Sequence, residues 1–184
     1  PREINGVAHL LEHMAFKGTE RRSAQDIVEE IESVGGHLNA YTSREQTAYY
    51  AKVLKENTVL ALDLLSDILQ NSNFDADELE RERTVVIQEI GQAHDTPDDL
   101  IFDHFQTVAF PDQPLGRPVL GSVETVGNMP RETIMGHMSA GYGGDRMVLS
   151  AAGNLEHDAF VQAASDLFDK IPPQAQVVME AGHY

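Results

Sequence analysis

Residues 6–17 read GVAHLLEHMAFK, and this stretch decides the fold. Four of its apolar side chains recur at the spacing of one helix face: Val7, Leu10, Leu11 and Met14. That spacing predicts a helix whose apolar face is buried in a core. Asn5 is placed to cap the start of this helix, and Gly18 is placed to end it.

The other face of the same helix carries His9, Glu12 and His13, which are neighbours because residues three and four apart lie side by side on a helix. Two imidazoles one turn apart can both bind zinc, and catalytic zinc keeps one of its four positions for water. Bound zinc lowers the pKa of that water toward about 7, so that Glu12 could take its proton. The order H-x-x-E-H is the inverted zinc-peptidase pattern. As five residues alone it is only moderately specific, since the same histidines could be ordinary surface residues.

A third ligand must come from another segment, and the helix predicted at residues 75–93 offers four glutamates: Glu78, Glu80, Glu82 and Glu89. Glu89 lies among valines and isoleucines, and a buried carboxylate is costly unless it is paired or bound to a metal. Glu82 lies two turns earlier on the same face and could support the metal ligands. Alternatively, Glu82 pairs at the surface with Arg81 or Arg83.

The rest of the chain mixes helices with an antiparallel pair of extended segments. Ser23 and Asp26 are spaced as in a capping box and predict a second helix that ends at residues 35–36. We expect paired strands at 38–42 and 46–54, helices at 57–70, 98–109, 131–140 and 156–170, a strand at 145–152 and a structured loop at 110–130. This mixture predicts an α+β fold in layers, with a mostly antiparallel sheet packed against helices.

The composition limits the chemistry and the partners. The 184 residues include no cysteine, so any metal must be held by histidine and carboxylate. The formal net charge of −17 repels nucleic acid and anionic membranes and attracts basic polypeptides, although the same charge also serves solubility. No stretch approaches the roughly 20 apolar residues of a membrane span. We therefore expect neither nucleic acid nor membrane as a partner.

The segment from His9 to Thr19 resembles the pitrilysin-type zinc peptidases, and is most similar to the processing-peptidase branch, with its mitochondrial presequence-cleaving enzyme and bacterial relatives. Glu89 falls in the segment that matches the third ligand of that family. The resemblance covers residues 4–173, and its other matching segments are Leu38–Thr42, Leu115–Pro118, Leu120–Gly121 and Ala152–Asn154.

This resemblance implies a zinc-dependent endopeptidase that hydrolyses peptides or presequences. It implies one Zn²⁺ held by His9, His13 and Glu89, with Glu12 as general base and Glu82 as a further catalytic residue. It also implies a substrate cleft lined by Phe16, Asn39, Ala40 and Tyr41. The strand at 38–42 could add a peptide substrate as another strand. Phe16 could instead be a core aromatic residue, and Asn39 a turn or edge residue.

The resemblance further implies a domain organisation. Residues 1–173 would be the zinc-binding N-terminal peptidase domain without its first strand or strands, and residues 174–184 a linker or tail. A second homologous domain or subunit would supply an Arg-Tyr pair that orients the substrate, so this chain alone would be weakly active or inactive. The implied compartment is the bacterial cytoplasm, with the mitochondrial matrix or periplasm as alternatives.

Two other interpretations remain open at this point. Some relatives act as non-catalytic partner or scaffold subunits, but these commonly lose metal ligands that are all present here. A closed structural zinc site would need a fourth protein ligand, for which His37 and His94 are available. Each of these two histidines is more simply explained as an exposed loop residue.

Overall fold

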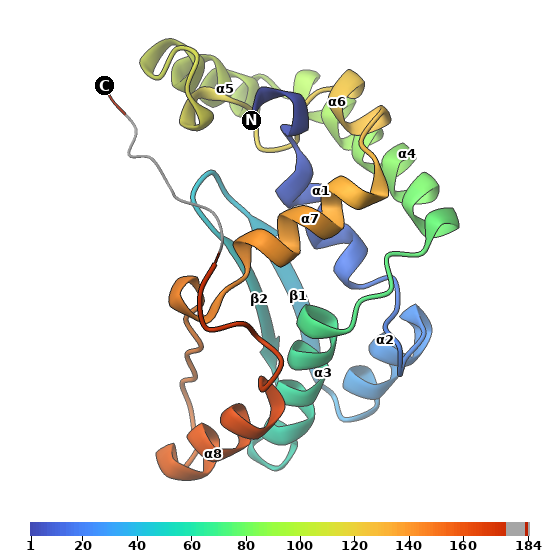
Figure 1. Cartoon of the computed structure of the whole chain (residues 1–184), viewed down its shortest axis with the longest axis vertical. Helices are drawn as coiled ribbons and strands as arrows, with labels where there is room; N and C mark the ends of the chain where they lie inside the picture. The colour runs from blue at the N-terminus through green and yellow to red at the C-terminus, as the bar shows by residue number, and fades with distance from the viewer. Residues whose placement is uncertain (176–182, 184) are drawn as a thin grey trace.

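The computed structural model describes residues 1–175 and His183, and in this part of the chain helices surround one small sheet (Figure 1). The helices are α1 (Val7–Ala15), α2 (Ala24–Ser33), α3 (Thr58–Gln70), α4 (Ala76–His94), α5 (Pro97–Ala109), α6 (Val123–Gly127), α7 (Arg131–Gly141) and α8 (His157–Leu167). Short 3-10 turns are η1 (Arg2–Ile4), η2 (Lys55–Asn57), η3 (Pro114–Gly116) and η4 (Gly144–Arg146). The strands are β1 (His37–Thr42) and β2 (Thr47–Lys52). The predicted α+β class is confirmed.

Helix α1 lies at the centre of this arrangement, where it contacts α4, α7 and both strands. The strands form an antiparallel hairpin whose register runs from His37 opposite Lys52 to Thr42 opposite Thr47. Helices α2 and α3 pack against the hairpin, and α8 packs against α3. The central position of α1 places its polar face between the sheet and α4.

The apolar face of α1 is buried as the spacing predicts, because Leu10, Leu11 and Met14 are fully inaccessible to solvent. These side chains share one core with Val86 of α4 and Ile134 of α7. Truncating one such side chain to alanine typically costs about 2–5 kcal/mol. The core therefore fixes α1 and α4 relative to each other, and with them the polar groups that the two helices carry.

The start of α1 differs from expectation, because Gly6 rather than Asn5 occupies the capping position. The Asn5 side-chain amide instead donates to the carbonyl oxygen of Pro118 at 2.9 Å. Gly6 has a φ of 93°, and a Cβ there would come within 2.8 Å of the carbonyl oxygen of Leu120. Only glycine fits such a left-handed and crowded position. The loop at 117–121 thus packs directly on the start of the helix. The Asn5 side chain is hydrogen-bonded to this loop and does not cap the helix.

The start of α2 agrees with expectation, since Ser23 and Asp26 form a reciprocal capping box. The Ser23 hydroxyl accepts from the backbone N–H of Asp26 at 3.1 Å, and the Asp26 carboxylate accepts from the backbone N–H of Ser23 at 2.9 Å. Two backbone donors that a helix start leaves without partners are satisfied in this way.

The predicted strand at 145–152 is wrong. After η4 the chain continues through residues 147–152 without regular structure, and the Val148 side chain is 93% exposed. A strand requires a hydrogen-bonded neighbour, and no described segment pairs with this one. Most of the expected linker at 174–184 lies outside the described residues.

Candidate active site

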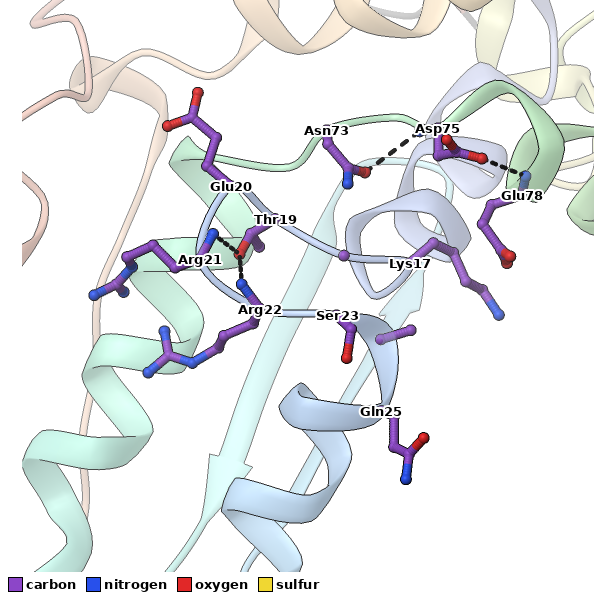
Figure 2. Close-up of a pocket in the computed structure, with 12 residues that line it drawn as sticks. Lys17, Thr19, Glu20, Arg21, Arg22, Ser23, Gln25, Asn73, Asp75 and Glu78 are labelled. Carbon is purple, nitrogen blue, oxygen red and sulfur yellow. Dashed lines mark hydrogen bonds between the residues drawn. The ribbon is translucent and has the colours of Figure 1, made fainter.

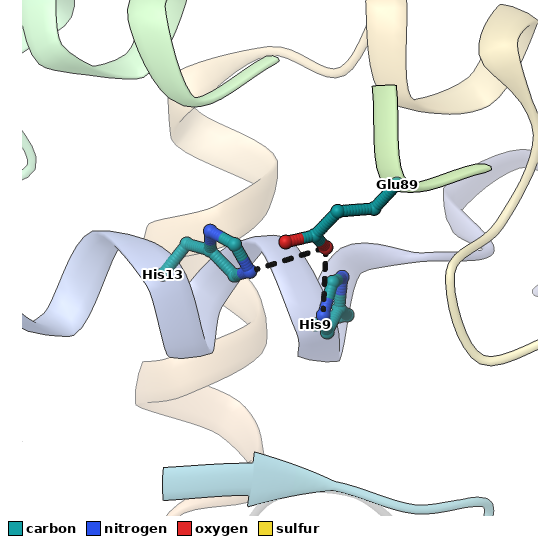
Figure 3. Close-up of side chains that lie close together, drawn as sticks. All are labelled: His9, His13 and Glu89. Atoms are coloured by element: carbon teal, nitrogen blue, oxygen red, sulfur yellow. Dashed lines mark ion pairs between the residues drawn. The ribbon is translucent and has the colours of Figure 1, made fainter. Parts of the chain in front are cut away.

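The side chains of His9 and His13, from α1, and Glu89, from α4, converge on one point (Figure 3). The Oε2 atom of Glu89 lies 3.6 Å from the Nε2 atom of His9 and 3.6 Å from the Nε2 atom of His13. One possible ligand atom from each residue lies within 4.8 Å of the other two. The three residues predicted to bind a metal are therefore neighbours in space.

These separations suit a shared metal ion better than direct hydrogen bonds, which span about 2.7–3.2 Å. Zinc–ligand bonds of about 2.1 Å in a tetrahedral shell place neighbouring ligand atoms about 3.4 Å apart. Two imidazoles and one carboxylate are also a donor set of catalytic zinc sites, which leave a position open for water. In the described part of the chain neither His37 nor His94 joins this group, and both are exposed. The residues thus fit an open zinc site.

Glu82 is buried against the cluster, with 6% of its surface exposed. Its Oε2 atom lies 2.9 Å from the Nδ1 atom of His13, and its Oε1 atom lies 2.7 Å from the Nζ atom of Lys17. Burial alone would raise the pKa of this carboxyl group, but the hydrogen bonds from Lys17 and His13 hold it below its ordinary value. A carboxylate at Nδ1 fixes the tautomer and ring orientation that present Nε2 to a metal.

The surface pairing of Glu82 considered as an alternative is wrong. Arg81 pairs with Glu78, and the Arg83 guanidinium lies 2.9 Å from the carboxylate of Glu80. Arg83 also donates to the carbonyl oxygens of Val126 and Met129. Both arginines are therefore engaged elsewhere.

His9 is held in its neutral form by its surroundings. Burial, followed by the charge of His13, lowers the pKa of His9 to about 4. Its Nδ1 atom is buried and has no hydrogen-bond partner among the described residues. At neutral pH the Nε2 atom facing Glu89 can therefore offer a lone pair, as metal ligation requires.

Glu12 lies on the same helix and is anchored from the sheet. Its Oε2 atom accepts a hydrogen bond, 2.5 Å long, from the hydroxyl of Thr42, which is the last residue of β1. The sequence did not indicate a role for Thr42, because this residue is far from Glu12 along the chain and local patterns do not reveal the contact. One indication was available: Thr42 ends the predicted strand at 38–42, which also carries three of the residues expected to contact the substrate.

The four residues expected to contact the substrate differ from one another in burial. Phe16 is partly buried, and its ring centroid lies 6.2 Å from that of Tyr49, so the structure favours a packing role. Asn39, Ala40 and Tyr41 follow one another on β1, where Asn39 is exposed and Tyr41 is 47% exposed. Among the described residues β1 pairs only with β2, so its other edge has no partner strand. These three residues remain candidates for substrate contact.

A hollow of about 580 Å³ lies between the segment from Lys17 to Gln25 and the start of α4 (Figure 2). Arg21 and Arg22 line this hollow, but both guanidinium groups pair with carboxylates of α3. We call this set the arginine–aspartate network, and its members are Arg21, Arg22, Glu30, Asp63 and Asp67. The arginines and carboxylates of this network pair with one another. The two guanidinium groups that line the hollow are therefore already engaged in ion pairs.

Within the described residues, none of the helices combines the length and the apolar character needed to cross a membrane.

The chain is similar to known proteins over most of its length. The family described as "Insulinase (Peptidase family M16)" matches residues 1–123. The chain is 48% identical over 169 residues to the probable mitochondrial-processing peptidase subunit beta of Arabidopsis thaliana, covering 92% of this chain and 32% of that protein. It is 46% identical to an uncharacterized zinc protease of Rickettsia felis, covering 92% of this chain and 41% of that protein.

Among solved structures, pitrilysin superposes with a TM-score of 0.84 at 25% sequence identity, covering 98% of this chain and 20% of pitrilysin. The expected resemblance to pitrilysin-type peptidases is confirmed. This chain spans less than half the length of the two curated relatives. More than half of its residues match the family's own pattern, and the chain therefore belongs to the insulinase family of peptidases, family M16.

Proposed function

We propose that the complete protein is a zinc-dependent endopeptidase, and that this chain supplies its metal ligands and its general base. The observation that carries the proposal is the meeting of His9, His13 and Glu89 from two helices at separations that suit one tetrahedral ion. The printed name of the Rickettsia felis relative, a zinc protease, supports the choice of metal.

In this proposal His9, His13 and Glu89 hold the ion, which when bound would polarise the scissile carbonyl and acidify a water molecule. Glu12 accepts a proton from the water as the water oxygen bonds to the scissile carbonyl carbon, and donates that proton to the departing amine as the C–N bond breaks. Glu82, paired with Lys17, orients His13 and keeps its Nε2 atom directed at the site. Glu82 thus acts through a ligand rather than on the substrate.

We assign the open edge of β1 to the peptide. A substrate in extended conformation can add to such an edge as a further strand, so that its backbone is held without demand for one sequence. Asn39, Ala40 and Tyr41 would contact it there, with Phe16 supporting the strand from its packed position. The net charge of −17 favours peptides that carry lysine or arginine.

We further propose that a second homologous domain or subunit completes the cleft, so that this chain alone has weak activity or none. The relatives' greater lengths support this arrangement, as does the word "subunit" in one of their names. We place the protein in the bacterial cytoplasm, with the mitochondrial matrix or periplasm as alternatives. The alternative of a non-catalytic scaffold subunit has no observation in its favour, because all four reactive side chains are present.

The proposal is tested by the Glu12→Gln variant of the complete protein, with Glu20→Gln, an exposed loop carboxylate, as the matched control. General-base catalysis typically contributes about 10²–10⁴-fold, so peptide hydrolysis should fall by about that factor in Glu12→Gln and stay unchanged in the control. Bound zinc, measured by elemental analysis, should remain at one per chain in both variants. Normal hydrolysis by Glu12→Gln would falsify the proposed role.

A further inference from the structure

A line of hydroxyl groups runs from the carboxylate of Glu12 into the protein. The Thr42 hydroxyl donates to the Oε2 atom of Glu12, and its oxygen lies 3.2 Å from that of Thr47. Thr47 is hydrogen-bonded to Tyr142, whose hydroxyl lies 3.4 Å from that of Tyr49. The line thus joins α1, both strands of the hairpin and the end of α7.

Counting protons gives this line a direction. A carboxylate can only accept hydrogen bonds, and each hydroxyl has one proton to donate. Since Thr42 gives its proton to Glu12, its oxygen must accept from Thr47. By the same reasoning Thr47 accepts from Tyr142, and Tyr142 accepts from Tyr49. Every hydroxyl in the line therefore points toward the carboxylate, as the charge of Glu12 favours.

The line leaves one carboxylate oxygen free. Among the described residues Thr42 is the only hydrogen-bond donor to Glu12, and it contacts Oε2 alone. The Oε1 atom therefore remains available for a water molecule. The hydroxyl of a strand residue is also a rigid anchor, because Thr42 lies within the paired register opposite Thr47.

We propose that Thr42 is the positioning residue of the general base: its hydroxyl, supported by Thr47, Tyr142 and Tyr49, holds Oε2 of Glu12 so that Oε1 faces the reacting water. This inference rests on the proposed function, since it concerns how Glu12 is held. It adds Thr42 to the residues on which the rate depends, although Thr42 itself touches neither metal nor substrate.

The test compares Thr42→Val, which removes the hydroxyl at nearly constant shape, with Thr42→Ser, which keeps it, in the complete protein. The matched control is Thr84→Val, because the Thr84 hydroxyl is exposed on α4 and bonds only to a backbone carbonyl oxygen. The measurements are kcat and KM for a peptide substrate, bound zinc and the midpoint of urea unfolding. Tyr142→Phe probes the next part of the line.

A hydrogen bond to a charged group contributes about 1.5–3 kcal/mol, which corresponds to roughly 10- to 150-fold in rate. We expect kcat of Thr42→Val to fall by a factor in that range, with KM within about twofold and bound zinc unchanged. Thr42→Ser should recover most of kcat, and Tyr142→Phe should lose less than Thr42→Val. Thr84→Val should match the parent protein.

Three results would overturn the inference: an unchanged kcat in Thr42→Val, a loss in Thr42→Ser as large as in Thr42→Val, or a loss accompanied by equal loss of zinc. The last would show a structural role only. Failure of the proposed function is seen separately, because Glu12→Gln would then retain activity. If Glu12→Gln is inactive while Thr42→Val is normal, only the positioning role is wrong.

Discussion

Two regions of the molecule are rich in ionisable groups: the metal-ligand cluster of His9, His13 and Glu89, and the arginine–aspartate network. They differ in whether their carboxylates are paired with arginine. In the network Asp67 is fully buried, and its two oxygens lie 3.1 Å from the Arg21 guanidinium and 2.9 Å from that of Arg22. In the cluster the Glu89 carboxylate faces two imidazoles at 3.6 Å, and no described lysine or arginine pairs with it.

The difference shows how a structural charge cluster is distinguished from a functional one. The network carries its own counter-ions, and its hydrogen bonds lower the pKa of Asp67 although burial alone would raise it. In the cluster a carboxylate and two imidazole nitrogens converge, and no lysine or arginine of the described residues pairs with that carboxylate. We therefore expect changes to the network to alter stability, and changes to the cluster to alter metal binding.

The largest expected effect is that of Glu89→Gln, which removes the only anionic ligand. Zinc affinity should fall by more than about 100-fold, since even residues that merely support ligands contribute 10- to 100-fold. The urea-unfolding midpoint of the metal-free protein should hardly change. Competition with a zinc-binding dye gives the affinity. Glu80→Gln, an exposed glutamate of the same helix, is the control. An unchanged affinity would remove Glu89 from the site.

Asp67→Asn should have the converse result. Arg22 keeps its pairs with Glu30 and Asp63, so the variant loses the charged hydrogen bonds of Asp67 rather than the whole ion pair. A hydrogen bond to a charged group contributes about 1.5–3 kcal/mol, and we expect a loss of stability of about that size. Equilibrium unfolding in urea measures this loss. Zinc affinity of the folded variant should equal that of the parent. A variant of normal stability would mean that the network, despite its geometry, is not a structural element.

The two regions should also respond to acid in different pH ranges. The pKa of His9 in the folded metal-free protein is about 4, below its ordinary value of 6.5, so the unfolded state binds more protons between these values. Its contribution to stability is complete above pH 6.5 and is lost as pH falls toward 4, by up to about 3 kcal/mol at 1.36 kcal/mol per pKa unit. Asp67, whose pKa is lowered from 3.8, loses its contribution only below that value.

Urea unfolding in the presence of a chelator at several pH values between 7 and 4 checks this order. The His9→Gln variant should lose the part of the pH dependence between 6.5 and 4 that His9 contributes, because it no longer carries this titrating group. His137, whose pKa is also lowered by burial, keeps its own contribution in both proteins. Identical pH profiles of parent and variant would contradict the assigned environment of His9.

The smallest of these effects is expected for Glu82→Gln, which keeps the shape of the side chain but removes its charge beside His13 and Lys17. Zinc affinity should fall by about 10- to 100-fold, the usual cost of losing a partner that orients a ligand. Glu78→Gln, in the first turn of α4 and paired with Arg81 rather than with His13, serves as the control. If Glu82→Gln weakened zinc binding as strongly as Glu89→Gln, Glu82 would act as a ligand itself.

Much of the fold follows from local patterns that the sequence displays. The apolar spacing of α1 and the capping box of α2 are both confirmed, since each depends on residues within a few positions of one another. The meeting of His9, His13 and Glu89 joins two helices that are far apart in the sequence, and Glu89 was matched to it through the resemblance to pitrilysin-type peptidases. The core shared by α1 and α4 brings the three side chains together. Their roles in binding and catalysis stay predictions.

What sequence analysis missed depends on contacts between distant segments. Asn5 was expected to cap α1, but the loop at 117–121 takes its side chain and forces Gly6 into the capping position. The β-prone residues after Arg146 were expected to form a strand, but a strand also requires a neighbour, which local composition cannot show. The contacts of Thr42 with Glu12 and of Lys17 with Glu82 were hidden for the same reason.

X-ray absorption spectroscopy of the zinc-loaded protein tests the central claim most directly. We predict a four-coordinate ion with two imidazole ligands and oxygen donors, all at about 2.0–2.2 Å, of which one oxygen belongs to exchangeable water. We also predict that His9→Gln and His13→Gln each remove one imidazole from the spectrum. Three or more imidazoles around the metal, or a spectrum that neither substitution alters, would contradict it.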